Sequence, residues 1–376
     1  MRSLMGWVLL CVGCGVRMPP IPFDPDAGGN EPPVVQDAGL ADGGVNRWAA
    51  VDALFTERVT TRDGGSGAMG LVVFDAQGQK VFEKYLGPIN GESRIAVASA
   101  SKLVSAMVLF EVIRRGQLSL DSTTGQVLGW TGPRAAITLR QLLSFTSGLP
   151  PTNLCTSNPL TTLAACVNVL SGVTLDAPPG TRYDYGSTHM HVAARMAEVV
   201  TGKTWPQLFD EVARQPLGLS GEAEYFCAPL QRAGRQNPLI AGGLVLTPNE
   251  YAKLLLVNAG RGTLGTTVIG APALYDEQGK EPFPGVTVGV SPVQALGLPF
   301  RYGLGAWLEC DTPGQGCDVI SSPGAFGFTP WVDRQAGYAA MLVTQEMRSS
   351  AESGVVGFSV NLEQALKPLI RTAISP

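Results

Sequence analysis

Ser99 and Lys102 are the two residues of this sequence whose types and spacing most directly suggest chemistry. They form a Ser-x-x-Lys pattern where an apolar segment with helical periodicity begins, and a spacing of three places both side chains on one helical face. A lysine that is partly removed from water loses its proton more easily and can activate a nearby serine hydroxyl. Since this spacing often arises by chance, the pattern alone describes an ordinary capped surface helix equally well.

Histidine is too scarce in this chain for several common mechanisms. Only His189 and His191 are present, which excludes a metal site built from several histidines. A Ser-His-Asp triad would need one of these two, and no G-x-S-x-G segment occurs to supply its serine. We therefore expect a nucleophile whose base is not histidine, and neither a metal nor a cofactor.

The residues on either side of this pattern predict the elements that hold it in place. Apolar residues at helical spacing over 47–60 predict an opening helix. Two β-rich runs, 69–74 and 79–85, flank the polar turn 75–78 and predict an antiparallel hairpin. Helical patterns broken by Pro/Gly loops dominate about 100–260. They are clearest at 102–115, 189–201 and 248–258.

Strand patterns return in the last quarter of the chain and are followed by a terminal helix. The expected strands cover 303–308, 318–321, 329–333 and 337–344, and the expected helix covers 362–372. This order predicts an α+β fold. Its antiparallel β-sheet is built from N- and C-terminal strands, is flanked by helices, and receives an inserted all-helical lobe.

Composition narrows the class of protein further. The 376 residues carry 27 Lys and Arg against 31 Asp and Glu, a net charge of -4, which offers nucleic acid no basic surface. The 46 glycines and 28 prolines indicate many turns and argue against a coiled coil or a helical solenoid. The hydrophobic fraction of 45% suits a globular protein with one large domain or two lobes.

The first 14 residues predict an export signal. A positive start at Arg2 precedes an apolar run that is too short to span a bilayer. The run ends in Val-Gly-Cys at 12–14, which resembles the lipobox of bacterial lipoproteins and implies that Cys14 is acylated as the mature N-terminus. Cys11 stands where that box usually has leucine, so ordinary cleavage with free secretion is the alternative.

Residues 15–46 predict a disordered tether between that anchor and a folded domain at 47–376. They contain six prolines, many glycines and five acidic residues, with almost no periodic apolar pattern. Such a linker lets a domain stand away from a membrane to which Cys14 is attached. We therefore expect a membrane-anchored lipoprotein of the bacterial cell envelope.

The cysteines beyond the signal fit an oxidising compartment, in which disulfides persist. Cys155 with Cys166, and Cys310 with Cys317, each close a short loop rich in turn residues, and we expect both pairs to be bonded. Cys227 then has no partner and is interpreted as a small buried hydrophobic residue.

Longer blocks around Ser99 and Lys102 resemble the serine β-lactamase and penicillin-binding protein superfamily, specifically its class C-like branch. The resemblance runs from about 50 to 370. Its blocks are IAVASASK at 95–102, GQLSLD at 116–121, ITLRQLLSFTSGLP at 137–150, PG and YDY within 179–185, AGGL at 241–244, and GAFG and WVD within 324–333. Six blocks in the superfamily's order are hard to obtain by accident.

This resemblance implies a β-lactamase/transpeptidase-like fold and an acyl-transfer site. In that site Ser99 attacks a carbonyl, Lys102 assists, and Tyr185 acts as general base and later as acid. A tyrosine needs a lowered pKa for this work, and the charge of Lys102 would favour the phenolate or keep the proton network poised. The backbone N–H groups of Ser99 and Ala325 would hold the oxyanion.

The sequence departs from the superfamily at two motifs expected to bind substrate. The Tyr-x-Asn motif is Tyr-Gly-Ser at 185–187, so Ser187 replaces an amide by a shorter hydroxyl. The Lys-Thr-Gly motif, or His-x-Gly in esterase-like members, is Ser-Pro-Gly at 322–324, formed by Ser322 and Gly324 around a proline. The cation that pairs with a substrate carboxylate is therefore missing, which disfavours penicillins and peptides ending in D-Ala-D-Ala.

We therefore predict an envelope-tethered serine hydrolase that forms an acyl-enzyme with an ester or amide, and an esterase rather than a β-lactamase or carboxypeptidase. The alternative is a binding or sensing lipoprotein that keeps the fold without turnover. His189 and His191 follow Tyr185 by about one helical turn and are interpreted as structural or rim residues. Asp121 and Asp333 fit a turn and a sheet end, and neither is assigned to catalysis.

Overall fold

The computed structural model describes residues 46–62, 67–310, 316–346 and 354–375. The predicted signal, the predicted acylation at Cys14 and, except for residue 46, the predicted tether lie outside these residues. In the part of the chain that is described, no helix is both long and apolar enough to cross a bilayer.

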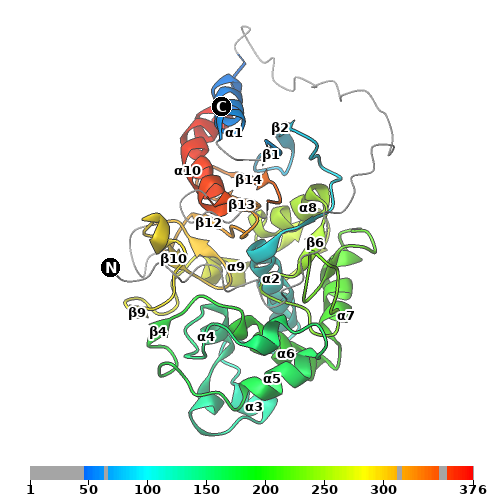
Figure 1. Ribbon diagram of the computed structural model, residues 1–376, viewed down its shortest axis with the longest axis vertical. Coiled ribbons are helices and arrows are strands. Elements are labelled where there is room, and N and C mark those ends of the chain that lie inside the picture. The colour runs from blue at the N-terminus through cyan, green and yellow to red at the C-terminus, as the bar shows by residue number, and fades with distance from the viewer. Residues whose placement is uncertain (1–45, 63–66, 311–315, 347–353, 376) are drawn as a thin grey trace, which may run out of the picture.

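A seven-stranded antiparallel sheet lies at the centre of the fold (Figure 1). Its strands are β1 (Met69–Phe74), β2 (Lys80–Leu86), β10 (Arg301–Tyr302), β11 (Trp307–Leu308), β12 (Val319–Ser321), β13 (Thr329–Asp333) and β14 (Tyr338–Val343). They are ordered β10-β11-β12-β13-β14-β1-β2. Because β1 pairs with β14, strands from both ends of the chain share one sheet. The predicted α+β arrangement is therefore confirmed.

Helices account for most of the remaining regular structure. They are α1 (Ala49–Thr61), α2 (Ser101–Arg114), α3 (Thr124–Leu128), α4 (Leu139–Leu143), α5 (Leu163–Leu170), α6 (Thr188–Thr201), α7 (Trp205–Phe209), α8 (Pro248–Ala259), α9 (Pro272–Gln278) and α10 (Val355–Ile374). The helices predicted at 47–60, 102–115, 189–201 and 248–258 are confirmed within one or two residues. The terminal helix begins earlier than predicted, at Val355 instead of residue 362.

Helices cover both faces of the sheet, and the alternation of side chains along β1 shows how. Leu71 and Val73 point to one face, where α1 and α10 lie side by side (Figure 1). Val72 and Phe74 point to the opposite face and join the main core, and α8 packs on β13 and β14. Because successive strand residues face opposite sides, a strand with two covered faces is apolar throughout.

Several short strands of the structure were not predicted from the sequence. Residues 303–308 were predicted as one strand, but the chain turns between β10 and β11. Gly305 lies in this turn with φ 77°, and a Cβ there would lie only 2.7 Å from the Cβ of Ala106. A second sheet joins β3 (Ile95–Ala96), β6 (Leu244–Leu246) and β5 (Glu224–Tyr225). Two further sheets have two strands of two residues each. One pairs β4 (Arg182–Tyr183) with β9 (Thr287–Val288), and the other pairs β7 (Thr263–Leu264) with β8 (Thr267–Val268). Such short strands carry too few residues to show a period of two.

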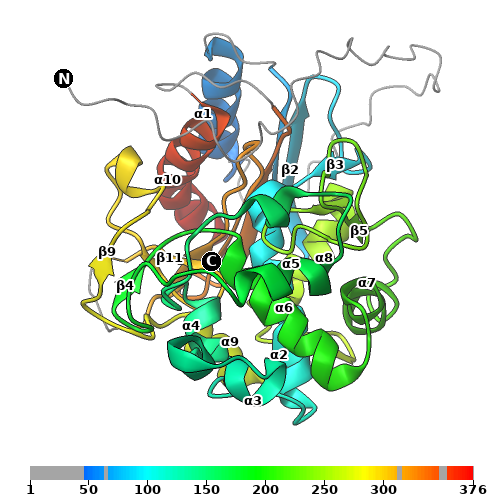
Figure 2. The same cartoon turned by 60° about the horizontal axis from the view of Figure 1, so that its bottom comes forward.

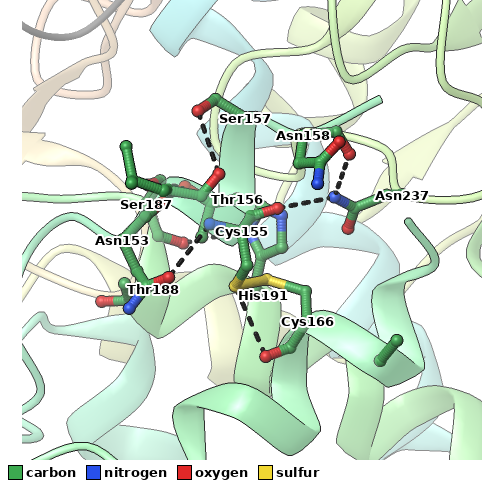
Figure 3. Close-up of a disulfide and its surroundings, with 12 residues drawn as sticks. Asn153, Cys155, Thr156, Ser157, Asn158, Cys166, Ser187, Thr188, His191 and Asn237 are labelled. Atoms are coloured by element: carbon green, nitrogen blue, oxygen red, sulfur yellow. Dashed lines mark hydrogen bonds between the residues drawn. A yellow bond between two sulfur atoms is a disulfide. The ribbon is translucent and has the colours of Figure 1, made fainter. Parts of the chain in front are cut away.

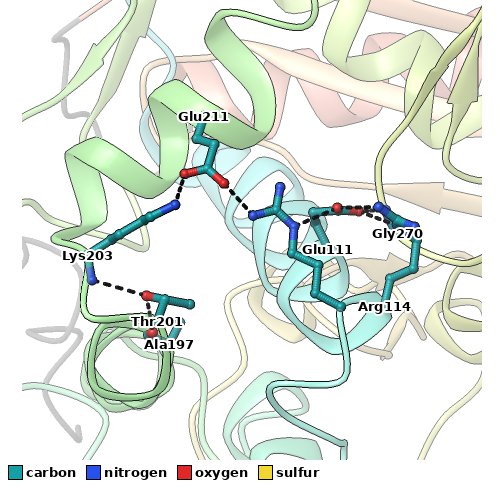
Figure 4. Close-up of polar contacts among 8 residues, drawn as sticks. Glu111, Arg114, Ala197, Thr201, Lys203, Glu211 and Gly270 are labelled. Carbon is teal, nitrogen blue, oxygen red and sulfur yellow. Dashed lines mark hydrogen bonds and ion pairs between the residues drawn. The ribbon is translucent and has the colours of Figure 1, made fainter.

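The predicted helical lobe lies between the two groups of sheet strands in the sequence. Its central helix, α6, packs against α2, α3, α4 and α5, and Figure 2 shows these helices gathered on one side of the sheet. The far end of α2 is held by Glu111, which is buried and accepts hydrogen bonds from Arg114, Arg115 and the N–H of Gly270 (Figure 4). Arg115 continues to Glu211, so this network connects α2 to the chain beyond α7.

Candidate active site

The Ser-x-x-Lys pattern spans a short 3₁₀ turn and the first turn of α2. Ser99 lies on the turn Ala98–Ala100, which follows β3, and Lys102 lies one residue into the helix. Ala98 has φ 46°, a left-handed conformation that costs a residue with a side chain about 1–2 kcal/mol. The Ser101 hydroxyl donates to the Ala98 carbonyl over 2.6 Å and helps to hold this sharp bend at the nucleophile candidate.

Lys102 contacts the Ser99 hydroxyl directly. Its Nζ lies 2.9 Å from Ser99 Oγ and donates to the carbonyl of Ala241 over 2.8 Å. Only 4% of the residue is exposed, and this burial lowers the pKa of Lys102 to about 7. A large share of Lys102 is therefore uncharged near neutral pH, so its nitrogen has a lone pair that can accept the hydroxyl proton.

Tyr185 follows β4 and comes to the same place from a distant part of the sequence. Its ring lies under Lys102, with 4.6 Å between Nζ and the ring centroid, and stacks on Trp307 at 5.2 Å. Burial raises the pKa of Tyr185 to about 12, although hydrogen bonds with Ser99 and Trp307 act in the opposite direction. The lowered pKa that a general-base role for Tyr185 requires is therefore not found, because the loss of hydration outweighs these hydrogen bonds.

The turn after β12 brings Ser322, Gly324 and Ala325 to the Ser99 turn. Ser322 Oγ donates to the Ser99 carbonyl over 3.0 Å. A Cβ on Gly324 would lie 2.2 Å from the carbonyl oxygen of Val97, so only glycine permits this close approach. Ala325 is exposed, and no backbone carbonyl of the described residues accepts a hydrogen bond from its N–H. That N–H is thus available beside the Ser99 turn, as an oxyanion contact requires.

Ser187, the third residue predicted to bind substrate, is held by contacts within the protein. Its side chain is buried, and its Oγ lies 3.0 Å from Oγ1 of Thr156. Its N–H donates to the carbonyl of Pro151 over 2.8 Å. The hydroxyl that replaces the amide of the Tyr-x-Asn motif is therefore engaged with the protein.

Both histidines are buried structural residues. His189 Nδ1 lies 2.7 Å from the Ser147 hydroxyl, and its ring stacks on Phe145. Burial lowers the pKa of His189 to about 3 and that of His191 to about 4, so neither is protonated at neutral pH. Within the described ranges, no group of three or more His, Cys, Asp or Glu residues could hold a metal ion.

The remaining acidic and cysteine residues have structural contacts. Asp333 pairs with Arg371 at 2.7 Å, and Asp121 is mostly exposed near Arg140. Both predicted disulfides, Cys155–Cys166 and Cys310–Cys317, are confirmed. The thiol of Cys227 is free and buried, and burial raises its pKa to about 11, which makes it unreactive.

Two features of the site were not identified from the sequence. One is the Ala241 carbonyl, which binds Lys102 although a backbone oxygen leaves no signal in the residue type. The other is the aromatic wall around Tyr185, made by Trp307, Tyr302 and Phe145. Trp307 was visible only as part of a predicted strand.

Comparisons with known proteins show the family to which the chain belongs. The family model described as Beta-lactamase matches residues 51–356. Penicillin-binding protein 4 of Amycolatopsis lactamdurans is 31% identical over 137 residues, which cover 35% of this chain and 36% of that protein. Lovastatin esterase of Penicillium rubens is 26% identical over 248 residues, covering 56% and 58%. The chain thus matches between about a third and three fifths of the length of these two relatives.

Solved structures resemble a larger part of the chain. A protein from Bacteroides dorei DSM 17855, proposed to be a beta-lactamase, has 28% identity and a TM-score of 0.74, with coverage of 85% of this chain and 98% of that one. Simvastatin synthase (LovD) from Aspergillus terreus has 18% identity and a TM-score of 0.64, covering 87% and 98%. EstCE1, a hydrolase with promiscuous acyltransferase activity, has 20% identity and a TM-score of 0.66, covering 85% and 100%. The last two likenesses concern the fold alone.

Proposed function

The chain belongs to the beta-lactamase family, and on this premise we propose that it is a serine hydrolase that cleaves esters through an acyl-enzyme on Ser99. The observation that carries the proposal is the 2.9 Å contact between Ser99 Oγ and the buried Nζ of Lys102. An uncharged amine at hydrogen-bond distance is what a serine without a histidine partner needs in order to become a nucleophile.

In the proposed first step, neutral Lys102 takes the proton of the Ser99 hydroxyl while Oγ attacks the ester carbonyl. The carbonyl oxygen gains the negative charge and accepts hydrogen bonds from the N–H groups of Ser99 and Ala325. The Ala241 carbonyl accepts a hydrogen bond from the lysine nitrogen and stabilises the ammonium that has formed. This step ends in a tetrahedral intermediate.

The intermediate then collapses and the bond to the leaving alcohol breaks. Because Tyr185 is still protonated near neutral pH, its hydroxyl can donate a proton to the departing alkoxide. The ammonium of Lys102, close to the Tyr185 ring, returns a proton to the phenolate. Water then attacks the acyl-enzyme, neutral Lys102 takes a water proton, and that proton returns to Ser99 Oγ as the acid leaves.

An ester fits the motifs at 185–187 and 322–324 better than a β-lactam or a peptide. No cation stands in the Ser-Pro-Gly segment to pair with a substrate carboxylate, and one such contact contributes about 1.5–3 kcal/mol. Ser187 replaces the asparagine of the superfamily, so the side-chain amide that would bind a peptide-like substrate is missing. The Ser187 hydroxyl contacts Thr156 instead. The likeness to a lovastatin esterase supports the same substrate class.

The test is reaction of the purified protein with a fluorophosphonate probe, followed by mass spectrometry of the peptide that contains Ser99. One adduct per molecule on Ser99, absent from a folded Ser99→Ala variant, is the expected result. An unlabelled but folded wild-type protein would favour the alternative, a binding or sensing protein with this fold.

We also propose that acylation at Cys14 anchors the enzyme to a membrane of the bacterial cell envelope and that 15–46 serves as its tether. The lipobox-like end of the apolar run and the Pro/Gly-rich composition support this location. Membrane fractionation of wild type and Cys14→Ser decides it, because only the wild type should require detergent for release.

The labelling rate should depend on pH through Lys102. Its ammonium form has no lone pair, so the rate should rise with pH, reach half of its maximum near pH 7 and level off above about pH 8. Tyr185 stays protonated over this range and should add no second limb. The measurement is the labelling rate from pH 5 to 9, corrected for spontaneous hydrolysis of the probe. A rate that falls as pH rises would contradict this role for Lys102.

A further inference from the structure

We propose that the loop closed by the Cys155–Cys166 disulfide positions the catalytic segment 185–187, so that reduction of this disulfide slows the enzyme. The inference rests on the proposed function and adds to it a control by redox conditions. Thr156 is the positioning residue through which the loop acts on Ser187, two residues from Tyr185.

The loop has little regular structure of its own and depends on cross-links. Between Pro151 and Leu163 its regular structure is one 3₁₀ turn, Leu154–Ser157, and Leu154 and Leu160 are 87% and 94% exposed. The disulfide ties the turn to α5. The Asn237 amide adds hydrogen bonds to the carbonyls of Cys155 and Asn158 (Figure 3).

Thr156, inside the disulfide-closed loop, and Pro150 and Pro151, just before it, contact the catalytic segment and the residue that follows it. The carbonyl of Pro151 accepts the N–H of Ser187 over 2.8 Å, and the carbonyl of Pro150 accepts the Thr188 hydroxyl. A Cβ on Gly186 would lie 1.9 Å from the Pro151 oxygen, so the two backbones touch directly. Thr156 is buried beside Ser187, and their hydroxyls are 3.0 Å apart.

Thr156 has two further contacts, one with the loop itself and one with Cys227. Its Oγ1 donates to the carbonyl of Asn153 over 2.8 Å, and its own carbonyl lies 3.7 Å from the Cys227 thiol. Dithiothreitol would convert Cys155 and Cys166 into two thiols while it becomes a cyclic disulfide itself. The loop ends are then free to separate, and the contacts to Ser187 compete with water.

The second disulfide provides a matched control. Cys310 and Cys317 connect the ends of β11 and β12, whose pairing of Trp307 with Ser321 already sets the position of both strands. Loss of this bond should therefore leave Tyr185 in place. The comparison separates a specific effect on the catalytic segment from the general cost of removing a disulfide.

The experiment compares the full chain carrying Cys155→Ser with Cys166→Ser against the full chain carrying Cys310→Ser with Cys317→Ser. For folded protein at saturating probe, labelling of Ser99 should slow at least about 10-fold in the first variant and less than about 2-fold in the second. Dithiothreitol should slow the wild type as much as the first variant. Equal labelling in wild type and the first variant, or equal losses in both variants, would overturn the proposal.

Two further measurements test the coupling, and the first of them does not depend on the proposed function. Hydrogen exchange of the Ser187 amide should speed up in the first variant only, whether or not Ser99 reacts, and unchanged exchange would overturn the coupling. Thr156→Val removes the hydroxyl and should slow labelling about 5-fold, and Thr156→Ser should restore it. Thr124→Val, at a buried threonine of α3, is the control for the exchange of hydroxyl for methyl and should leave labelling unchanged. An equal effect of both valine variants would refute the positioning role.

Discussion

Replacing Lys102 by methionine is expected to slow both Ser99 labelling and ester hydrolysis by about 10³-fold, within the range of a general base. Methionine keeps an unbranched apolar stem in a site that is 4% exposed, so the packing changes little. What disappears is the nitrogen 2.9 Å from Ser99 Oγ, and with it the acceptor for the hydroxyl proton. Stopped-flow or gel-based labelling rates, together with ester turnover, give the comparison.

The control for this prediction is Lys253→Met. Lys253 lies on α8, and its Nζ donates to the carbonyls of Leu217 and Gly218 and not to Ser99. The rates of this variant should match those of the wild type. The Lys102→Met protein should also lose the rise of rate around pH 7. A folded Lys102→Met protein that labels at the normal rate, with the same pH midpoint, would exclude Lys102 as the base.

Replacing Tyr185 by phenylalanine is expected to slow the hydrolysis of alkyl esters by about 10²-fold while it affects fluorophosphonate labelling much less. The reason is that an alkoxide needs a proton to leave, whereas fluoride does not. Burial raises the pKa of Tyr185 to about 12, so the phenol is available as that proton donor throughout the neutral range. Phenylalanine keeps the ring that stacks on Trp307 at 5.2 Å and removes only the hydroxyl.

A series of leaving groups makes this prediction specific. Ethyl and p-nitrophenyl esters of the same acid should differ more in the Tyr185→Phe variant than in the wild type, because the nitrophenolate leaves without assistance. Tyr338→Phe, whose hydroxyl accepts a hydrogen bond from Trp331 in the central sheet, is the matched control. If all esters and the probe slowed equally, Tyr185 would act before the leaving group departs, and a base role would have to be reconsidered.

Elements with strong local signals could be predicted from the sequence with accurate bounds. The hairpin of β1 and β2 is one such case. Its two strands come from runs rich in β-branched and aromatic residues, and the polar turn 75–78 separates them. The helix at 248–258 begins at a capping box, with Thr247 as N-cap and Glu250 three residues later. Elements of two residues, such as β3 and β11, carry no comparable signal and form only through their partners.

The pairing of Ser99 with Lys102 was determined by the sequence itself. Their separation of three residues at the start of a helix brings the side chains together by local geometry, whatever the rest of the chain does. Tyr185 was assigned by a resemblance, because 83 residues of sequence separate it from Lys102 and no local rule connects them.

Only the tertiary structure decided how these groups ionise and what holds them. The pKa of Lys102 falls and that of Tyr185 rises because remote segments, including the Ala241 carbonyl and Trp307, surround both groups and exclude water. Likewise, the contact of Ser187 with Thr156 depends on a loop closed by a disulfide. Spacing along a helix is a local property that residue types reveal, whereas desolvation is the sum of contacts from the whole fold.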